Sequence, residues 1–465
     1  MELVAALHDF VWGLLADWVC FVAVFLCLGL NFGPWRLIPY GLRQLWLSLR
    51  TPATPAGGHD GELDSATAFL VTLGGTVGIG NITGVALAVS LGGPGVLAWL
   101  WAVSLVGMAL KFSETALAVR FRRPQADGSV LAGPMLTIRR GLQPRWRWLA
   151  VLFTAMSVLS AFGSSNGLQV GQLAAVLAQD LGSPPLLTGL VTALATAAVI
   201  SGGLGRVGRV SALLVPLMVL GYGLAMAVLL LRHNAELRPV RDQVLAGALA
   251  PRAIAAGSVA VTVGAAVRLA VFSNEAGTGS AAIVQAAARP ADPLRQGSIA
   301  MLGNLVDTAL CSATGLLLIA SGASGAGTAI APLALVDAAM DWARPGSQWI
   351  SHLAIVLFSF TTILSAAVVA ERCLLFLAGA RWRLAFRCCW CAALVLLAPF
   401  GGSGLWLTAE LLEALVVLPN LLSLLLLSPL LFQWFADAVP RMGRTSAATA
   451  PARSAPHSSP RHPSP

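Results

Sequence analysis

The sequence predicts an all-α polytopic membrane protein with about eleven transmembrane helices, arranged as a 5+5 inverted repeat with two discontinuous helices. The first observation is composition: of 465 residues, 57% are hydrophobic and 11% charged, and the mean hydropathy is +0.80. An average globular chain carries about 25% charged residues, so this chain lacks the side chains to cover a soluble exterior. The other two observations are a series of long apolar runs and a glycine-rich interruption in two of them.

The apolar runs give the number of spans, because a helix crosses the hydrocarbon of a bilayer with about 20 residues. Nothing ionisable occurs between Ser65 and Leu110, or between Trp148 and Gln179. Eleven candidate spans lie near 11–30, 66–90, 94–118, 148–180, 186–202, 210–231, 253–288, 298–322, 350–378, 384–400 and 405–434.

Arginines between the spans predict the orientation, because short cytoplasmic loops carry an excess of Lys and Arg. If the N-terminus lies outside, the inner loops hold clusters such as Arg120, Arg122 and Arg123. The outer loops are then nearly bare, apart from the longer segment 232–252 with four arginines. We therefore expect the N-terminus outside and the C-terminus inside.

The remaining segments divide the chain. Residues 36–50 and 330–343 are expected to lie on the membrane surface, the first because arginines alternate with Trp and Leu. The predicted units are 1–64 (an extra N-terminal helix and an interfacial segment), 65–232 and 233–436 (the two repeats), and 437–465 (a disordered cytoplasmic tail rich in Ala, Ser, Pro and Arg).

Two glycine-rich strings interrupt apolar spans, GGTVGIGN at 74–81 and SNEAGTGS at 273–280. Close packing of small residues would explain one such string. The second begins a set of five spans just as the first does, and it enters from the opposite side. Irregular backbone at membrane depth is tolerated only against protein or a polar cavity. Two unwound helices in an inverted repeat are typical of secondary transporters.

Unwound helices supply ligands without using charged side chains. The freed N–H groups carry partial positive charge and suit a carboxylate, whereas the freed carbonyls suit a small hard cation such as Na⁺. Several enzyme and pump motifs are absent: G-x-x-x-x-G-K-[ST], H-E-x-x-H and G-x-S-x-G. The seven cysteines have no metal-site spacing. We therefore expect a transporter, with no enzymatic activity, no ATP-binding subunit and no nucleic-acid partner.

At these strings the sequence resembles the alanine or glycine:cation symporter family, also called sodium:alanine symporters. The strings that carry the resemblance are GTVGIGNITGVALAVSLGGPG (75–95), GMALKFSETALAVRFR (107–122), GPMLTIRRGL (133–142), FSNEAGTGS (272–280), QGSIAMLGNLVDT (296–308), FTTILSAAVVAERC (360–373) and LPNLLSLLLLSP (418–429). The resemblance implies a leucine-transporter-like fold. It also implies uptake of a small neutral amino acid with Na⁺, or with H⁺, across the bacterial cytoplasmic (inner) membrane.

The resemblance also implies site residues. On the cation side it places the carbonyls of Gly74 and Val77 and the hydroxyls of Thr361 and Thr362, together with Ser365 one turn further on. Phe272 resembles a gating aromatic residue. The substrate set that the resemblance implies is Thr76, Gly78, Gly80, Asn81, Asn166, Gln169, Phe272, Asn274, Gly277 and Gly279.

At several positions the sequence departs from the family pattern, so the family's substrate cannot be assigned directly to this chain. Residues 365–370 (SAAVVA) replace a run that is usually aromatic, so the pocket is expected to be enlarged at Ala366. Glu410 and Glu413 stand where the family has Asp and Asn. A different small zwitterion, a D-amino acid, or H⁺ coupling therefore stays open, as does a non-transporting sensor or channel.

Charges within the spans are functional candidates, because they are costly at bilayer depth. Lys111 and Glu114 lie three residues apart on one helix and are expected to form a structural pair. Glu275 lies inside the second interruption. It is expected to cap a freed helix end, to couple to a cation, or to carry a proton.

Overall fold

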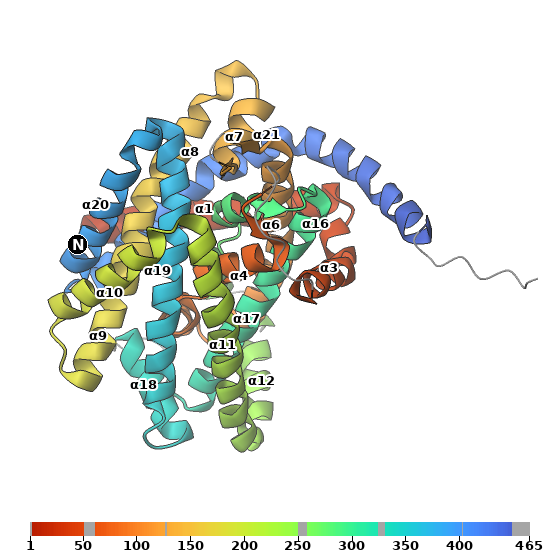
Figure 1. Ribbon diagram of the computed structural model, residues 1–465. Helices are drawn as coiled ribbons and strands as arrows, with labels where there is room; N and C mark the ends of the chain where they lie inside the picture. The colour runs from red at the N-terminus through yellow and green to blue at the C-terminus, as the bar shows by residue number, and fades with distance from the viewer. Residues whose placement is uncertain are drawn as a thin grey trace, which may run out of the picture.

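The computed structural model describes residues 2–50, 61–125, 128–249, 258–323, 331–401 and 403–448, and these are built almost entirely of helices (Figure 1). Within these ranges the strands are two short pairs. β1 (Leu63–Asp64) pairs in parallel with β4 (Ala288–Arg289), and β2 (Arg123–Pro124) pairs antiparallel with β3 (Val130–Leu131). The predicted all-α class is therefore confirmed.

Each predicted span coincides with a helix or with an interrupted helix. In the described part of the chain, seven helices are long and apolar enough to cross a bilayer, and shorter apolar helices accompany them. The helices of the spans are α1 (Glu2–Gly29), α4 (Ser65–Thr76) with α5 (Thr83–Gly92), α6 (Val96–Phe121), α8 (Trp148–Ser160) with α9 (Gln169–Leu181), α10 (Pro185–Ile200), α11 (Gly203–Arg232), α14 (Ser258–Asn274) with α15 (Ser280–Gln285), α16 (Pro293–Ala300) with α17 (Leu302–Ala320), α19 (Gln348–Ala378), α20 (Arg383–Leu397) and α21 (Ser403–Ala448).

Short helices connect the spans. They are α2 (Gly33–Arg36), α3 (Ile38–Arg50), α7 (Pro134–Gly141), α12 (Asn234–Leu249), α18 (Pro332–Ala343) and the single turns η2 (Pro144–Trp146) and η4 (Ala380–Trp382). α3 covers most of the predicted interfacial segment and exposes Trp46 and Leu49 beside Arg43 and Arg50. Such a mixed surface suits the boundary between water and lipid.

Both predicted interruptions are present. α4 ends at Thr76, and the single turn η1 (Ile79–Asn81) separates it from α5. In the second interruption, Glu275 has a φ of 50° and Gly277 a φ of 95°. A left-handed backbone costs little for glycine but is unfavourable for other residues, so Glu275 is held there by its surroundings. The discontinuous helices follow directly from the glycine content of the two strings.

A third interruption, which the sequence pattern did not predict, lies in the span 148–180. η3 (Ala161–Leu168) is a π-helical segment between α8 and α9. π segments are rare, and they occur frequently at functional sites because the wider turn alters how side chains are presented. This one carries Ser164, Ser165 and Asn166.

Equivalent short helices of the two halves lie at opposite ends of the bundle. α7 follows the second span of the first half, and α18 follows the second span of the second half. Figure 1 places α7 at the top of the molecule and α18 at the bottom. Two halves that enter the membrane from opposite sides require this arrangement. It agrees with the 5+5 inverted repeat, whose boundaries at 65–232 and 233–436 stay a prediction.

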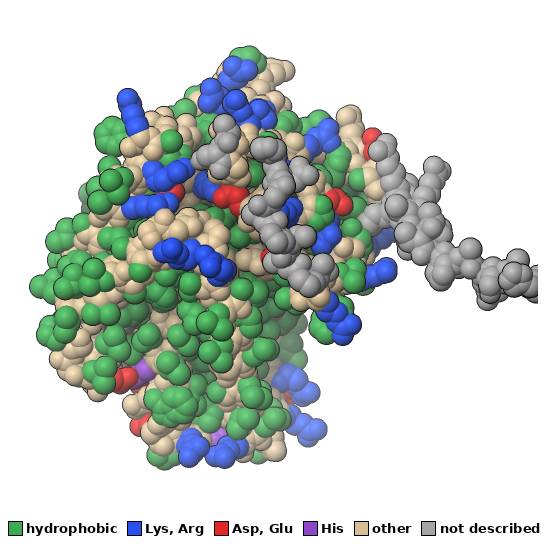
Figure 2. All heavy atoms as spheres, in the orientation of Figure 1, with side chains coloured by type: hydrophobic (Ala, Val, Ile, Leu, Met, Phe, Trp, Pro, Cys, Tyr) green, Lys and Arg blue, Asp and Glu red, His purple; other side chains and the backbone are tan. Residues whose placement is uncertain are grey.

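The surface carries a broad apolar region between two charged ends. Figure 2 shows hydrophobic side chains across the middle of the visible face, with most Lys and Arg at the end near α7 and a smaller group near α12. α21 continues to Ala448, so a helix extends past residue 437, where the disordered tail was predicted to start. Residues 449–465 of that tail, 253–257 of the seventh predicted span, and 51–60 lie outside the described residues.

Candidate functional site

Two adjoining cavities lie where the interrupted helices meet. The larger has a volume of about 60 Å³ and the smaller about 10 Å³. Both are lined by Gly75, Ser164, Ser165, Glu275 and Glu413, which come from four segments: α4, η3, the second interruption and α21. The cavities therefore form one continuous site at the level of the three interruptions.

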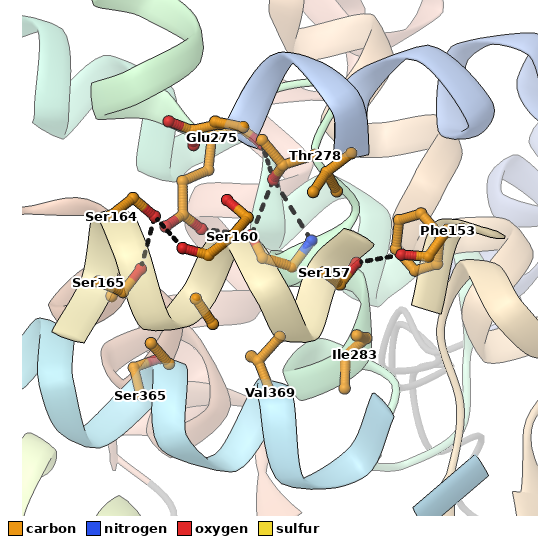
Figure 3. Close-up of a pocket in the computed structure, with 16 residues that line it drawn as sticks. Phe153, Ser157, Ser160, Ser164, Ser165, Glu275, Thr278, Ile283, Ser365 and Val369 are labelled. Carbon is orange, nitrogen blue, oxygen red and sulfur yellow. Dashed lines mark hydrogen bonds between the residues drawn. The ribbon is translucent and has the colours of Figure 1, made fainter. Parts of the chain in front are cut away.

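Hydroxyl side chains line one wall of the larger cavity. Figure 3 shows Ser157, Ser160, Ser164 and Ser165 following one face of α8 and η3, with Ser365 of α19 across from them. Ser157 and Ser160 lie in the last turn of α8, and Phe153, one turn before Ser157, also lines the larger cavity, which therefore extends from η3 toward the start of α8. The serines, apart from Ser365, were not among the predicted site residues. The run of small polar residues at 163–166 was the signal that could have identified them.

Three oxygen atoms meet where α19 crosses the end of α4. Thr362 Oγ1 lies 3.2 Å from the Gly74 carbonyl oxygen and 3.4 Å from the Val77 carbonyl oxygen. Carbonyls in the last turn of a helix lack intrahelical partners, and these two accept instead from the Thr362 hydroxyl. Neighbouring oxygens at right angles around a cation, each about 2.4 Å from it, lie about 3.4 Å apart. The spacing therefore fits one small hard cation.

The other predicted cation residues lie close to this point. Thr361 Oγ1 lies 3.1 Å from the carbonyl oxygen of Phe358 in its own helix. Ser365 Oγ lies only 2.6 Å from where a Cβ on Gly75 would be, so α19 leaves no room for a side chain there. Gly75 thus lets α19 approach α4, while a Cβ on Gly74 would lie 2.7 Å from Val215 of α11 and 3.3 Å from Thr361 of α19. The structure brings together Gly74, Val77, Thr361, Thr362 and Ser365.

Five of the predicted substrate residues line the smaller cavity: Thr76, Gly78, Gly80, Gln169 and Phe272. A Cβ on Gly78 would lie 3.0 Å from Thr362 Oγ1 and 3.1 Å from Gln169 Nε2, which is tighter than ordinary contact. The amide N–H of Ile79 donates to Gln169 Oε1 at 3.4 Å. The smaller cavity therefore adjoins the oxygen group of Gly74, Val77 and Thr362.

Asn81 is directed away from the cavities. Its Nδ2 donates to Asp307 Oδ1 at 2.7 Å, while its Oδ1 accepts from the amide N–H of Gly78 at 3.0 Å. Asp307 Oδ2 accepts from Ser273 Oγ at 2.5 Å. Ser273 belongs to the second interrupted helix. The carboxylate of Asp307 on α17 thus joins the two interrupted helices, a role that spacing along the sequence does not reveal.

The other four predicted substrate residues also lie outside the lining of the two cavities. Asn166 Nδ2 donates to the Trp390 carbonyl at 3.0 Å, so this amide faces α20. The carbonyl of Asn274 accepts from Lys111 Nζ at 2.6 Å. The Gly277 carbonyl accepts from Asn420 Nδ2 at 2.9 Å. At Gly279 there is no room for a side chain, because a Cβ there would collide with Pro134. These contacts hold the interrupted segments in place on the side that faces away from the two cavities.

Buried charges at the site have different partners from those expected. Lys111 bonds to the Asn274 carbonyl, and Glu114 Oε1 accepts from Asn420 Nδ2 at 2.6 Å, so the predicted Lys111–Glu114 pair is replaced by contacts to other helices. A spacing of three residues places the two side chains on one face of the helix, but Lys111 bonds instead to the Asn274 carbonyl and Glu114 to Asn420.

Glu275 and Glu413 face the cavities. Glu275 Oε2 accepts a hydrogen bond from Ser280 Oγ, at the first residue of α15. Glu275 thus contacts the freed helix end through a hydroxyl, while it lines both cavities. Glu413 lines both as well, and its Oε2 has no hydrogen-bond partner among the described residues.

An aromatic pair lies on the opposite side of the smaller cavity. Phe272 lines that cavity and also a separate hollow beyond it, which Trp406, Arg268 and Glu410 help to line. The rings of Phe272 and Trp406 have centroids 5.1 Å apart. Trp406 Nε1 donates to Glu410 Oε1 at 2.8 Å, and the other oxygen of Glu410 lies 2.6 Å from His8 Nε2. Phe272 therefore separates the two spaces.

Comparisons with known proteins agree on one family. The profile of the sodium:alanine symporter family matches residues 1–445. The sodium/alanine symporter AgcS of Methanococcus maripaludis is 33% identical over 438 residues, which cover 92% of this chain and 95% of that protein. An uncharacterized transporter of Haemophilus influenzae is 32% identical over 452 residues and covers 95% of this chain and 96% of that protein.

A solved structure shows the same fold. The crystal structure of MhsT in complex with L-phenylalanine superposes with a TM-score of 0.58 at 15% identity, covering 81% of this chain and 99% of that chain. At this identity the likeness concerns the fold alone. It confirms the predicted leucine-transporter-like fold of a polytopic membrane protein.

Proposed function

The chain belongs to the sodium:alanine symporter family, which makes it a cation-coupled amino-acid symporter, and we propose that it takes up a small neutral amino acid with Na⁺ by alternating access. Alanine or glycine is the default substrate. The proposed coupling ion is Na⁺, with H⁺ as the alternative.

The observation that carries the proposal is the oxygen group of Gly74, Val77 and Thr362. Its members come from α4 and α19, which belong to different halves of the chain. A cation bound there gains ligands only while the two helices are together. Cation binding would therefore favour one arrangement of the halves over the other, which is what coupling requires.

The lining of the two adjoining cavities has the chemistry of an amino-acid site. Backbone at the first interruption and the amide of Gln169 offer donors for an α-carboxylate, and Glu275 offers an acceptor for an α-ammonium group. Na⁺ at Thr362, which adjoins the smaller cavity, would offset the charge of the α-carboxylate. Ligand and cation would then raise each other's affinity by the same factor.

Contacts at both ends of the pathway support alternating access. On one side, Phe272 and Trp406 close the smaller cavity. Toward the other end, Arg372 Nη2 of α19 lies 2.6 Å from Oε2 of Glu62, the residue before β1. β1 in turn pairs with β4, which follows α15 in the chain. Alternate breaking of these two closures would open the site to one side at a time.

The distribution of arginines supports the proposed orientation. The end near α7 carries most of the visible Lys and Arg (Figure 2), and cytoplasmic loops carry such an excess. We place this end in the cytoplasm of a bacterial inner membrane, with the N-terminus outside. A cysteine-accessibility assay with a membrane-impermeant reagent on Ser183→Cys and Arg145→Cys variants tests the assignment. Labelling of position 145 but not 183 in intact cells would contradict it.

Transport in proteoliposomes tests the function. We expect an inward Na⁺ gradient to drive accumulation of labelled alanine or glycine above equilibrium, and dissipation of the gradient to abolish it. Ala366 lines the larger cavity, which motivates a competition panel that includes D-alanine and other small zwitterions. Accumulation driven by a pH gradient alone would favour H⁺ coupling. If neither gradient drives any amino acid, the symport proposal is wrong.

Phe272→Ala should weaken substrate retention. The change removes the ring that separates the smaller cavity from the hollow at Trp406, so the bound substrate is no longer shielded from water. We expect the half-saturating alanine concentration to rise about ten-fold, the equivalent of about 1.4 kcal/mol. Phe272→Tyr retains the ring and should keep the value within about three-fold. Labelled uptake measures both; equal values for Phe272→Ala and the wild type would argue against a gate.

A further inference from the structure

We propose that Glu413 selects an amino acid whose side chain carries a second ammonium group, that is, a short diamino acid bound with its side chain in the larger cavity. The inference rests on the proposed symport and goes beyond its default substrate, because it places a charged side chain where alanine has a methyl group. It starts from Glu413, a cavity carboxylate whose Oε2 has no hydrogen-bond partner among the residues that the structure describes.

Glu413 lies on α21 and is only 7% exposed. Its Oε2 has no hydrogen-bond partner in the part of the chain that the structure describes, although it lines both cavities. A buried acceptor without a partner is costly, and such groups are rare in folded proteins. Glu410, one turn earlier, shows the contrast, because Trp406 and His8 contact its two oxygens. The unpartnered oxygen of Glu413 is therefore available to a donor group of a ligand.

Charge balance identifies the kind of donor. Glu275 and Glu413 both line the two cavities, and no Lys or Arg is among the described lining residues. The α-ammonium group of an amino acid can offset one of these carboxylates, while Na⁺ offsets the α-carboxylate. The buried Lys111 donates to the Asn274 carbonyl next to Glu275 but lines neither cavity, so a second carboxylate, Glu413, stays ionised only if the ligand brings a further positive charge, and otherwise takes up a proton. A side-chain ammonium group supplies the missing positive charge.

The larger cavity has suitable size and polarity. About 10–15 Å³ of comparable space holds one water, so the volume of about 60 Å³ admits a side chain of a few non-hydrogen atoms. An ammonium group has three donors and needs several acceptors. Ser160, Ser164 and Ser165 line the cavity beside Glu413, and the small side chain of Ala366 leaves the space open. Short chains, such as those of 2,3-diaminopropionate and 2,4-diaminobutyrate, meet these limits.

Binding to the purified full-length protein in detergent with Na⁺, measured by calorimetry, tests the proposal separately from transport. The probes are two matched pairs: alanine with 2,3-diaminopropionate, and 2-aminobutyrate with 2,4-diaminobutyrate. Asparagine serves as a neutral donor of similar reach. We expect the better diamino acid to bind roughly 10–100-fold more tightly than its apolar partner, as for a hydrogen bond to a charged group. Equal binding, or tighter binding of the apolar partner, would overturn the proposal.

A variant assigns the preference to Glu413. Glu413→Gln should reduce the ratio of the two affinities at least ten-fold, whereas Glu410→Gln should leave the ratio unchanged, because Glu410 lies outside both cavities. If Glu413→Gln is unstable in detergent, Glu413→Asp, which keeps the charge but shortens the reach, should show a reduced ratio. A preference that persists in Glu413→Gln overturns the assignment. So does a Glu413→Gln variant whose Na⁺ or pH dependence changes while the ratio stays, since Glu413 would then bind the coupling ion.

Failure of the inference differs from failure of the proposed function. Na⁺-driven uptake of alanine without tighter binding of either diamino acid overturns the inference and leaves symport intact. Tight, Glu413-dependent diamino-acid binding without uptake driven by Na⁺ or H⁺ supports the inference and overturns symport.

Discussion

Thr362→Ala will remove most of the Na⁺ dependence of uptake, with a rise in the half-saturating Na⁺ concentration of roughly 10–100-fold. Thr362 Oγ1 is the side-chain oxygen that faces the Gly74 and Val77 carbonyls, so alanine deletes one ligand of the proposed cation. The range corresponds to about 1.5–3 kcal/mol, typical of a polar contact to a charged group. Initial rates of labelled alanine uptake over a series of external Na⁺ concentrations measure the shift.

Two further variants make the result specific. Thr362→Ser keeps a hydroxyl at the same position and should restore most of the Na⁺ affinity. Ser359→Ala removes a buried hydroxyl from the same helix, one turn away, which has no hydrogen-bond partner among the described residues. This variant should therefore keep the wild-type Na⁺ dependence. A Thr362→Ala protein with an unaltered half-saturating Na⁺ concentration would place the coupling ion elsewhere.

Asp307→Ala is expected to cause the largest loss of stability. Its carboxylate accepts from Asn81 Nδ2 at 2.7 Å and from Ser273 Oγ at 2.5 Å, and the residue is fully buried. Alanine leaves both donors without this partner, and each buried polar group so affected costs about 1–3 kcal/mol. We expect a destabilisation of roughly 2–4 kcal/mol, with both interruptions loosened together. Thermal unfolding in detergent, followed by fluorescence or light scattering, measures it.

The controls for Asp307 separate the hydrogen bonds from charge. Asp307→Asn keeps one acceptor and should fall between alanine and the wild type. Asp341→Ala removes an exposed carboxylate of α18 whose one described hydrogen bond goes to the amide N–H of Gly346, and it should cost less than about 1 kcal/mol. If Asp307→Ala unfolds at the wild-type temperature, the carboxylate does not hold the two interruptions together.

The sequence alone determined the elements that depend on local chemistry. Glycines at 74–80 and 277–279 weaken the helices, and bilayer depth demands that the freed backbone face a polar space, so both interruptions were predictable. The spacing of the apolar runs determined the spans, because helix length must match bilayer thickness. The string at 360–364 placed Thr362 on a helix, and its hydroxyl does meet the carbonyls at the first interruption.

Only the tertiary structure decided which polar side chains reach the cavities. Asn81 and Asn166 have amide groups that could bind a substrate, yet these amides face Asp307 and α20. Ser164, Ser165 and Glu413 line the cavities instead. Each residue turns about 100° around a helix, and the π segment shifts that rotation, so direction depends on how neighbouring helices pack. Composition and spacing determine where a helix breaks; the packing of the other helices determines what the break contacts.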